Sequence, residues 1–497
     1  MYPQKDDIKM LRIIFTSDVH GNMDMLMRCA SSFDKDEHTI IIDGGDTIQG
    51  SPFSTYIHAN SIGAKPIAQT LNLAGFDFVT LGNHDFNYGP DYLRAYLNDL
   101  NTACVCANVV GNLPVFPYII HTMPNGLKVG ITGIVTEYVN IWEKEDNLRG
   151  ISVSSPFDAA YHALQQMKSV ADICICIYHG GFECDITSGE ILTNSTENIA
   201  SKICKELDFD VLLTGHQHMP IEGCLHHGTF VVQPGSNAKH FIEIAGELRD
   251  GAFQFASRFV EPGNECLNDS GSHLSAVNVG LQKWLEMPLG TMLEPLLPEE
   301  RVEMALRGSP IATLFNSIQL EATGAQISCV GLANDIPGFN SVVRMRDIVE
   351  NYPFNNNLVT MQITGAQLVA ALERTASYLS LDANGVPQVS RSFLYPKVEH
   401  YNYDFFTGVT YTADLRKPIG ERVSNVKVNG IEITLEATFT LCMSSYRATG
   451  TGGYDVYKAC PTIEHGHQEV SELICDYISR KGNIYVENEE APNWIYI

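Results

Sequence analysis

Short polar motifs follow the apolar runs in the first half of this 497-residue chain. The run Leu11–Phe15 leads into Asp18 and His20, and four later runs lead into motifs of the same kind. Aspartate, asparagine and histidine side chains suit Zn²⁺, Mn²⁺, Fe or Co ions as ligands. The polar residues of the five motifs are Asp18, His20, Asp46, Asn83, His84, His179, His216 and His218.

The number of these residues exceeds what one tetrahedral ion needs. About seven ligands suit two ions that share a carboxylate, and such ions, ~3.5–4 Å apart, activate water and bind a phosphoryl group. A single histidine after a strand is more often structural than a ligand, so this interpretation depends on the five motifs occurring together. The sequence therefore predicts a centre of two divalent metal ions (Mn, Zn, Fe or Co).

Alternating β and helical patterns must position these motifs. Residues 1–262 repeat short β-rich runs with helical stretches between them, such as 90–100 and 155–171, which predicts an α/β fold. Ligands of open α/β sheets bind beyond the carboxyl ends of the strands, where the motifs stand. Because residues i and i+2 share one face of a strand, we expect Asp18 and His20 to point the same way. Residues 227–260 alternate like exposed antiparallel strands.

The length of the chain is too great for one core and indicates at least two domains. A polar, glycine-containing stretch near 263–273 marks the end of the first domain, and helical spacing follows it. We expect a first domain at 1–265, a linker with a connecting helix at 266–299, and a second domain at 300–497. The second domain should open with helical residues 301–323 and contain a tight β-hairpin turn at Asn429-Gly430.

Charge and cysteine content limit the partners. A formal net charge of −26 disfavours nucleic acid and anionic membranes, although bound divalent ions can still create a site for a small anion. No apolar run suits a membrane span, and the N-terminus lacks the layout of a signal peptide. The 13 cysteines form no C-x-x-C pair, which indicates reduced thiols and a cytoplasmic location. A secreted or surface form with its leader removed is the alternative. We expect a monomer or weak oligomer.

The motifs DVH, GGD, GNHD, YHGG and GHQH, in this order, resemble those of the calcineurin-like metallophosphoesterases. The resemblance implies an αββα sandwich in which Asp46 bridges two metal ions. It also implies that His84 stabilises the transition state or protonates the leaving oxygen. The other ligands would be Asp18, His20 and His218 at one ion, and Asn83, His179 and His216 at the other.

Three stretches of the second half, 346–373, 401–415 and 443–457, resemble the C-terminal motifs of the 5′-nucleotidase branch of that superfamily. This resemblance implies a C-terminal α/β substrate domain. By motif position, Tyr403 and Tyr446 would hold the base of a nucleotide. Stacking of this kind contributes ~1–3 kcal/mol per base and tolerates different bases.

Two departures from the 5′-nucleotidase pattern narrow the substrate. Asn87 stands where that subgroup has an aspartate that orients the catalytic histidine, and residues 331–339 contain no phosphate-binding arginine. Both features resemble the 2′,3′-cyclic-nucleotide 2′-phosphodiesterase/3′-nucleotidase subgroup. We therefore expect hydrolysis of nucleotide phosphoesters of that class. The alternatives are a 5′-nucleotidase or UDP-sugar hydrolase, and a non-catalytic nucleotide-binding protein on the same scaffold.

Overall fold

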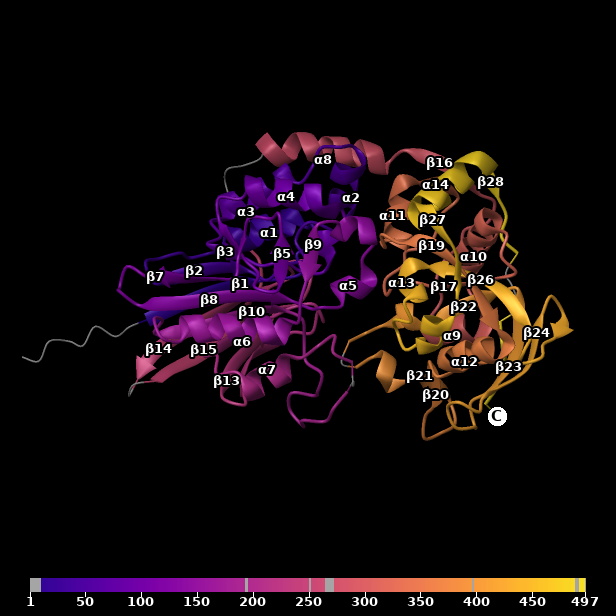
Figure 1. Ribbon diagram of the computed structural model, residues 1–497. Helices are drawn as coiled ribbons and strands as arrows, with labels where there is room; N and C mark the ends of the chain where they lie inside the picture. Colours follow the sequence, from indigo (N-terminus) through magenta and orange to yellow (C-terminus); the bar gives the residue numbers. More distant parts are fainter. Residues whose placement is uncertain are drawn as a thin grey trace, which may run out of the picture. The chain divides into compact units, whose positions relative to one another are not determined.

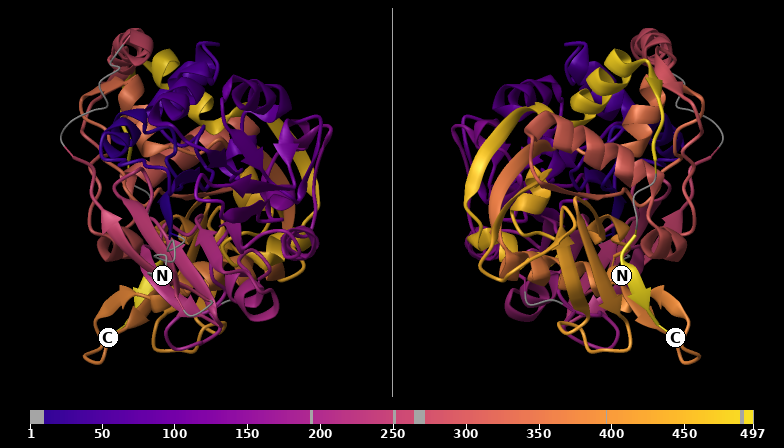
Figure 2. Two further views of the ribbon diagram at one scale, coloured as in Figure 1. Left: turned by 90° about the vertical axis from the view of Figure 1, so that its left-hand side faces the viewer. Right: turned by 90° about the vertical axis from the view of Figure 1, so that its right-hand side faces the viewer.

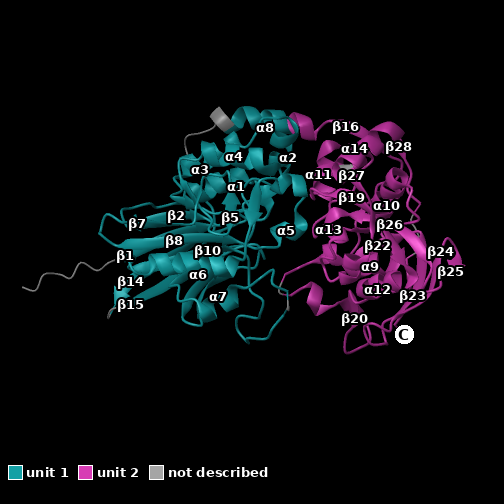
Figure 3. Cartoon of the chain, viewed as in Figure 1, with its two compact units in different colours: residues 1–281 teal, residues 282–497 magenta. Residues whose placement is uncertain are grey.

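The computed structural model describes residues 10–192, 195–249, 252–263, 272–395, 397–487 and 491–496. The chain forms two compact units, residues 1–281 and 282–497 (Figure 3). Most of the polar stretch predicted to end the first domain, residues 264–271, lies outside the described residues. Among those that are described, no helix has the length and apolar character that crossing a membrane requires.

Unit 1 is built on two β-sheets. The first has seven strands, and the other has six. In order, the first contains β15 (Ala252–Val260), β14 (Phe241–Arg249), β1 (Met10–Thr16), β2 (Thr39–Asp43), β3 (Phe78–Val79), β4 (Ala103–Val105) and β6 (Val115–Phe116). The other contains β12 (Ile221–His226), β13 (Thr229–Gln233), β11 (Val211–Thr214), β10 (Ile173–His179), β8 (Lys128–Val135) and β7 (Tyr118–Thr122).

Strand β10 shows how the sequence builds the layers. Its isoleucines at 173, 175 and 177 are buried with Phe15 and Ile40 of the first sheet, in the core between the sheets. The alternate residues, including Cys176 and Tyr178, pack with residues of α6 (Pro156–Met167) and α7 (Ala200–Glu206). Figure 1 shows α6 and α7 on one outer side and α1 (Met23–Ala30), α3 (Lys65–Ala74) and α4 (Gly89–Asp99) on the other. Unit 1 is the predicted αββα sandwich.

The prediction of exposed antiparallel strands over residues 227–260 is wrong in part. Strands β14 and β15 do form an antiparallel hairpin at the edge of the seven-stranded sheet (Figures 1 and 2). Strand β13 pairs antiparallel with β12 on one side, but it runs parallel to β11 on the other and is buried along its whole length. Its residues Phe230 and Val232 belong to the inter-sheet core, whereas Val231 packs on the helical side, so both faces of β13 are covered.

Unit 2 has a mixed α/β architecture. Where a single helical stretch was predicted over 301–323, two helices form, α9 (Arg301–Arg307) and α10 (Pro310–Thr323). Gly308, with a φ of 85°, ends α9, and Ser309 caps α10 ahead of Pro310. The predicted turn at Asn429-Gly430 is confirmed, since both residues have positive φ between β24 (Val423–Val428) and β25 (Ile431–Glu432).

The largest sheet of unit 2 among the described residues has five strands. Helices α12 (Gly365–Ala376) and α14 (Val470–Lys481) contribute buried residues to the two main cores of the unit. The strands are, in order, β22 (Asp404–Thr407), β17 (Ile327–Gly331), β26 (Thr438–Ser444), β19 (Asn357–Thr364) and β27 (Thr462–Glu469).

Candidate metal centre

The predicted ligands meet at the carboxyl ends of strands from both sheets of unit 1. β1, β2 and β3 run parallel in one sheet, and β8, β10 and β11 run parallel in the other. Asp18, which follows β1, lies 3.8 Å from Nε2 of His179, the last residue of β10. The two sheets therefore deliver their polar residues to one place, as the positions of the motifs predict.

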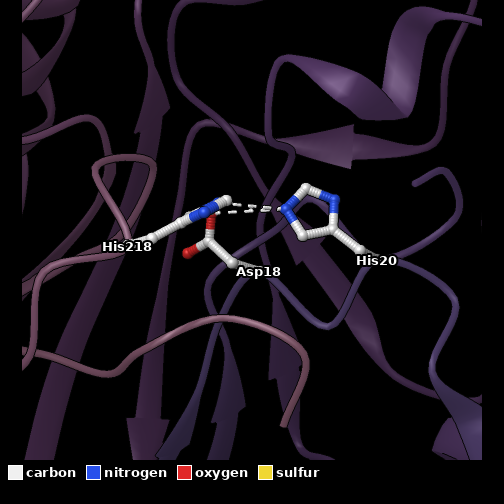
Figure 4. A group of neighbouring side chains, drawn as sticks. All are labelled: Asp18, His20 and His218. Atoms are coloured by element: carbon white, nitrogen blue, oxygen red, sulfur yellow. Dashed lines mark hydrogen bonds and ion pairs between the residues drawn. The ribbon is translucent and has the colours of Figure 1, made fainter. Parts of the chain in front are cut away.

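One group of potential ligands consists of Asp18, His20 and His218 (Figure 4). Nε2 of His218 lies 3.3 Å from Oδ1 of Asp18 and 3.1 Å from Nε2 of His20. Nε2 of His20 lies 4.0 Å from the same oxygen of Asp18. Each of the three side chains therefore offers one potential metal-ligand atom, and these atoms lie within 4.8 Å of one another.

A second group consists of Asp46, His179 and His216. Nε2 of His179 lies 3.1 Å from Oδ2 of Asp46, and Nδ1 of His216 lies 2.9 Å from Oδ1 of Asn83. All seven residues predicted as metal ligands are therefore next to one another. Their individual roles as ligands stay a prediction.

The backbone at these residues adopts an unusual conformation. Five of the predicted ligands, which are Asp18, His20, Asp46, His216 and His218, have φ between 52° and 70°. Side-chain-bearing residues rarely occupy this left-handed region, and strain of this kind concentrates at functional sites. β1 ends at Thr16, so Asp18 and His20 lie in a loop beyond the strand. Their common direction comes from that loop and not, as predicted, from alternation along the strand.

Asp85 connects the loops that carry the ligands, and the sequence interpretation did not assign it a role. Its buried carboxylate accepts hydrogen bonds from the backbone N–H groups of Asp46, Thr47, Ile48 and Gly82, at 2.8–3.1 Å. A Cβ atom at Gly82 would collide with Oδ1 of Asp46, which explains the glycine there. The aspartate of GNHD was the signal available in the sequence.

The hydrogen bonds of two histidines leave one ring nitrogen of each for an ion. Nδ1 of His20 is bonded to the carbonyl oxygen of Gln49 at 2.9 Å, and Nδ1 of His179 to that of Gly44 at 2.7 Å. A carbonyl can only accept, so Nδ1 carries a hydrogen, and in the neutral ring Nε2 keeps its lone pair, as in histidine ligands of metals. Nε2 of His179 is fully buried and makes no hydrogen bond within the described part of the chain.

The electrostatics of the cluster also suit a cation. Burial lowers the pKa of His20 to about 4, which keeps its imidazole neutral. Burial alone would lower the pKa of His179 too, but the carboxylates of Asp46 and Asp18 raise it to about 10, so Nε2 holds a proton when no ion is bound and a metal ion would replace that proton. Burial would raise the pKa of Asp46, yet the attraction of His179 and His84 holds it well below its usual range. Buried carboxylates need compensating positive charge, and Nε2 of His179 lacks a hydrogen-bond partner among the described residues, so divalent ions suit this group of carboxylates and imidazoles.

His84 lies beside the cluster, as the sequence interpretation requires of a catalytic residue. Its ring centroid is 5.4 Å from that of His20, and its Nδ1 is 2.8 Å from Oδ1 of Asn87. Asn87 therefore stands where it was predicted, oriented toward His84. Its Nδ2 donates to Oε2 of Glu143 at 2.6 Å, a carboxylate that the sequence interpretation missed because it lies 56 positions further along the chain.

Two further residues missed from the sequence surround His216. Nε2 of His216 lies 3.0 Å from Oε1 of Glu197, and the ring of Trp142 stacks on the imidazole with centroids 5.5 Å apart. Trp142 ends the short helix α5 (Val139–Trp142), directly before Glu143. No motif in the sequence marks either residue.

The two tyrosines predicted to hold a base lie in different environments in unit 2. Tyr403 is 3% exposed, packs against Tyr378 and Phe405, and donates its hydroxyl hydrogen to the carbonyl of Ala305. This burial contradicts its predicted role, because neither face of the ring is open to a base. Tyr446 is half-buried in the short helix α13 (Ser445–Ala448), and its contact with a base stays a prediction.

The arginines of unit 2 that could bind a phosphate have protein partners. Arg447 is 4% exposed and pairs with Asp404 at 2.9 Å, and Arg374 donates to Gly452 O and Ser377 Oγ. Arg344 and Arg346 both pair with Glu286, at 3.2 and 3.1 Å. Residues 331–339 are contacted by Arg301, which donates to backbone carbonyl oxygens there.

Comparison with known proteins identifies two family domains. The calcineurin-like phosphoesterase family matches residues 11–220, and the 5′-nucleotidase C-terminal domain matches residues 290–459. A Staphylococcus aureus structure, provisionally assigned as a 5′-nucleotidase and solved in complex with alpha-ketoglutarate, superimposes with a TM-score of 0.91. It is 30% identical, and the match covers 98% of this chain and 100% of that one.

Two curated relatives match nearly the whole chain. The 2′,3′-cyclic-nucleotide 2′-phosphodiesterase/3′-nucleotidase of Yersinia enterocolitica is 24% identical, and the match covers 97% of this chain and 87% of that protein. The trifunctional nucleotide phosphoesterase protein YfkN of Bacillus subtilis is 25% identical over 97% of this chain, which spans only 38% of that protein's length.

Proposed function

Because the chain belongs to the calcineurin-like phosphoesterases with a 5′-nucleotidase C-terminal domain, we propose that it is a two-metal hydrolase of nucleotide phosphoesters. We propose 2′,3′-cyclic nucleotides, and then 3′-nucleotides, as its substrates. The observation that carries the proposal is the meeting of Asp18, Asp46 and His179 beside His84.

Two divalent ions would be held by the residues predicted from the motifs. We propose Mn²⁺, Zn²⁺, Fe or Co, since imidazole, carboxylate and amide ligands suit these metals. Such ions supply Lewis acidity toward the phosphoryl oxygens and lower the pKa of water. Asp46 would bridge them, and the proposed ligand sets are Asp18, His20 and His218 at one ion, and Asn83, His179 and His216 at the other.

The chain's own residues act on the leaving group and on the base. We propose that His84 acts in its protonated, imidazolium form: it gives the Nε2 proton to the departing ribose oxygen and keeps the Nδ1 hydrogen that is bonded to Asn87. Tyr446 would stack on the base. Tyr401, which is half-buried and contacts Phe354 edge to face, is our choice for the second aromatic in place of the buried Tyr403.

The environment of the arginines supports a cyclic substrate. A 5′-monophosphate is a dianion at neutral pH, and its tight orientation normally calls for arginine in addition to metal. A 2′,3′-cyclic phosphate carries a single negative charge and therefore needs less positive charge from the protein. Arg447, Arg374, Arg344 and Arg346 are each engaged by protein groups within unit 2, which leaves the ions and the stacked base as the main contacts.

The state of the cysteines gives information on the cellular compartment of the protein. The 12 cysteines in the described part of the chain are unpaired, and ten of them are buried. Unpaired buried thiols are typical of reducing compartments, so we keep the cytoplasmic location as a proposal.

The proposal is tested by preparing metal-free protein and restoring Mn²⁺, Co²⁺ or Zn²⁺ before a substrate panel. Hydrolysis of 2′,3′-cyclic AMP that depends on the added metal, at about two ions per chain, supports the function. Preference for 5′-AMP would support the 5′-nucleotidase alternative, which is also the provisional assignment of the Staphylococcus aureus relative. Nucleotide binding without hydrolysis under every metal would favour the non-catalytic alternative.

A further inference from the structure

We propose that Glu143 is a positioning residue that fixes the side-chain amide of Asn87, and through it the tautomer of His84. This inference rests on the proposed function, in which His84 acts on the leaving oxygen. A hydrogen-bonded relay joins the three side chains, with 2.8 Å from His84 Nδ1 to Asn87 Oδ1 and 2.6 Å from Asn87 Nδ2 to Glu143 Oε2.

The chemistry of the groups sets the direction of every hydrogen bond in this relay. A carboxylate only accepts hydrogen bonds, so the end of the Asn87 amide that faces Glu143 must be its NH₂ group. The amide oxygen therefore faces His84, and Nδ1 of His84 must carry the hydrogen. Nε2 is then the nitrogen that exchanges a proton with substrate. An amide alone could turn either way, whereas an amide beside a carboxylate has one orientation.

Glu143 is itself held in place by its neighbours. Its Oε1 accepts from the backbone N–H of Lys144 and from Nδ2 of Asn147, both at 2.8 Å. The same Nδ2 of Asn147 donates to the backbone carbonyl of Asn87 at 2.8 Å. The carboxylate therefore presents only Oε2 to the Asn87 amide, and residues 143–147 are attached to the turn that carries His84.

The relay places a negative charge one residue further from the imidazole than a direct histidine–aspartate pair would. In the 5′-nucleotidase pattern an aspartate stands at the position of Asn87. Here the amide transmits the orientation, and Glu143 supplies the acceptor that fixes it. An exchange of the two groups should then preserve the pattern. An amide at position 143 could donate to a carboxylate at position 87, and that carboxylate would still accept from His84.

This reasoning makes opposite predictions for single and double variants of the metal-loaded full chain. In E143Q, the side-chain oxygen would keep the hydrogen bonds from Lys144 and Asn147, so the new NH₂ group would face the NH₂ group of Asn87. The Asn87 amide must then turn and present its own NH₂ group to His84. In N87D, two carboxylates face each other. Each single variant should lose about 10–100-fold in kcat for 2′,3′-cyclic AMP, with KM within about threefold. The double variant N87D/E143Q should recover to within about fivefold of the unmodified protein.

Three further measurements separate positioning from structural damage. Metal content should stay the same in all variants, and E145Q, which removes an exposed carboxylate of the same segment, should behave like the unmodified protein. A 4-nitrophenyl phosphodiester, whose leaving group needs little protonation, should lose less than about threefold. Equal activity of E143Q and E145Q, or no recovery in the double variant, would overturn the relay.

Failure of the proposed function would look different. If the metal-loaded, unmodified protein hydrolyses neither ester, the function falls, and the relay is then tested by ¹⁵N NMR of histidine-labelled protein. At a pH at which the ring of His84 is neutral, the relay predicts the Nδ1–H tautomer in the unmodified protein and the Nε2–H tautomer in E143Q. The same tautomer in both proteins would contradict it.

Discussion

The backbone N–H of His84 donates a hydrogen bond to Oδ1 of Asp46 at 2.7 Å. The residue predicted to bridge two metal ions thus also fixes the start of the turn that carries the predicted catalytic histidine. In the proposed site, metal binding and the position of His84 would therefore be linked through a single side chain. Substitutions at the two residues should nevertheless separate them.

Asp46→Asn should remove metal and leave the fold intact. An asparagine keeps an oxygen that can accept from His84 N–H, but it lacks the charge needed to bridge two cations. We expect metal content to fall from two ions per chain to one or fewer, and activity to be lost. Metal analysis by mass spectrometry checks this, with Asp99→Asn, an exposed position on α4, as the charge-matched control. Full metal content in Asp46→Asn would show that Asp46 is not a ligand of the metal centre.

His84→Asn should have the opposite result. His84 belongs to neither group of potential ligands, so both ions should remain bound. Loss of a proton donor at the leaving oxygen lowers kcat by ~10²–10⁴. Steady-state kinetics and metal analysis on the same preparation test this prediction. If metal leaves together with activity, His84 is a ligand.

Tyr446→Ala and Tyr401→Ala should each weaken nucleotide binding. Lost stacking of ~1–3 kcal/mol per base raises KM for 2′,3′-cyclic AMP by about 5–150-fold. Hydrolysis of a phosphodiester that lacks a nucleobase should change little. The matched control is Tyr403→Phe, which removes only the hydroxyl bonded to Ala305 and should lower the free energy of unfolding by about 1 kcal/mol without changing KM. Equal losses on both substrates would make Tyr446 structural.

Asp43 gives a pH-dependent prediction for the stability of the metal-free protein. Burial raises the pKa of this carboxyl to about 7, against the lowering effect of hydrogen bonds from Thr47 and Thr16. Between pH 4 and 7 the folded chain keeps a proton that the unfolded chain has released, so this group's contribution to stability falls as pH rises.

Asp43→Asn removes that dependence. Its free energy of unfolding relative to the unmodified protein should rise by about 1–4 kcal/mol between pH 4.5 and 7.5. Urea unfolding of metal-free protein at the two pH values measures the difference. The same offset at both pH values would show that Asp43 does not titrate in this range.

Sequence patterns predicted the α/β architecture and the meeting of the ligands because both depend on local information, whereas the αββα sandwich was implied by the family resemblance. Apolar runs set the strands, and parallel strands bring their carboxyl ends to one edge. The left-handed backbone at Asp18 and His20 could not be predicted, since neighbouring loops impose it: Asp18 N–H bonds to Gly45 O, and His20 N–H to Asp46 O.

Contacts between residues far apart in the chain also could not be predicted from the sequence. Glu143 contacts Asn87 across 56 positions and Glu197 contacts His216 across 19, and neither glutamate belongs to a recognisable motif. Tyr403 was assigned by its place in a motif, but side-chain packing against Tyr378 and Phe405 decides its burial. Motif position alone could not tell that the ring of Tyr403 is buried, whereas that of the neighbouring Tyr401 is only half-buried.

The most direct test of the account is the ratio of kcat/KM for 2′,3′-cyclic AMP to that for 5′-AMP, measured on one metal-loaded preparation. Because Arg447, Arg374 and Arg344 are paired within unit 2, we expect the cyclic substrate to be preferred by at least about tenfold, or ~1.4 kcal/mol in transition-state binding. A preference for 5′-AMP would show that an arginine reaches the phosphate, and it would contradict the proposed substrate.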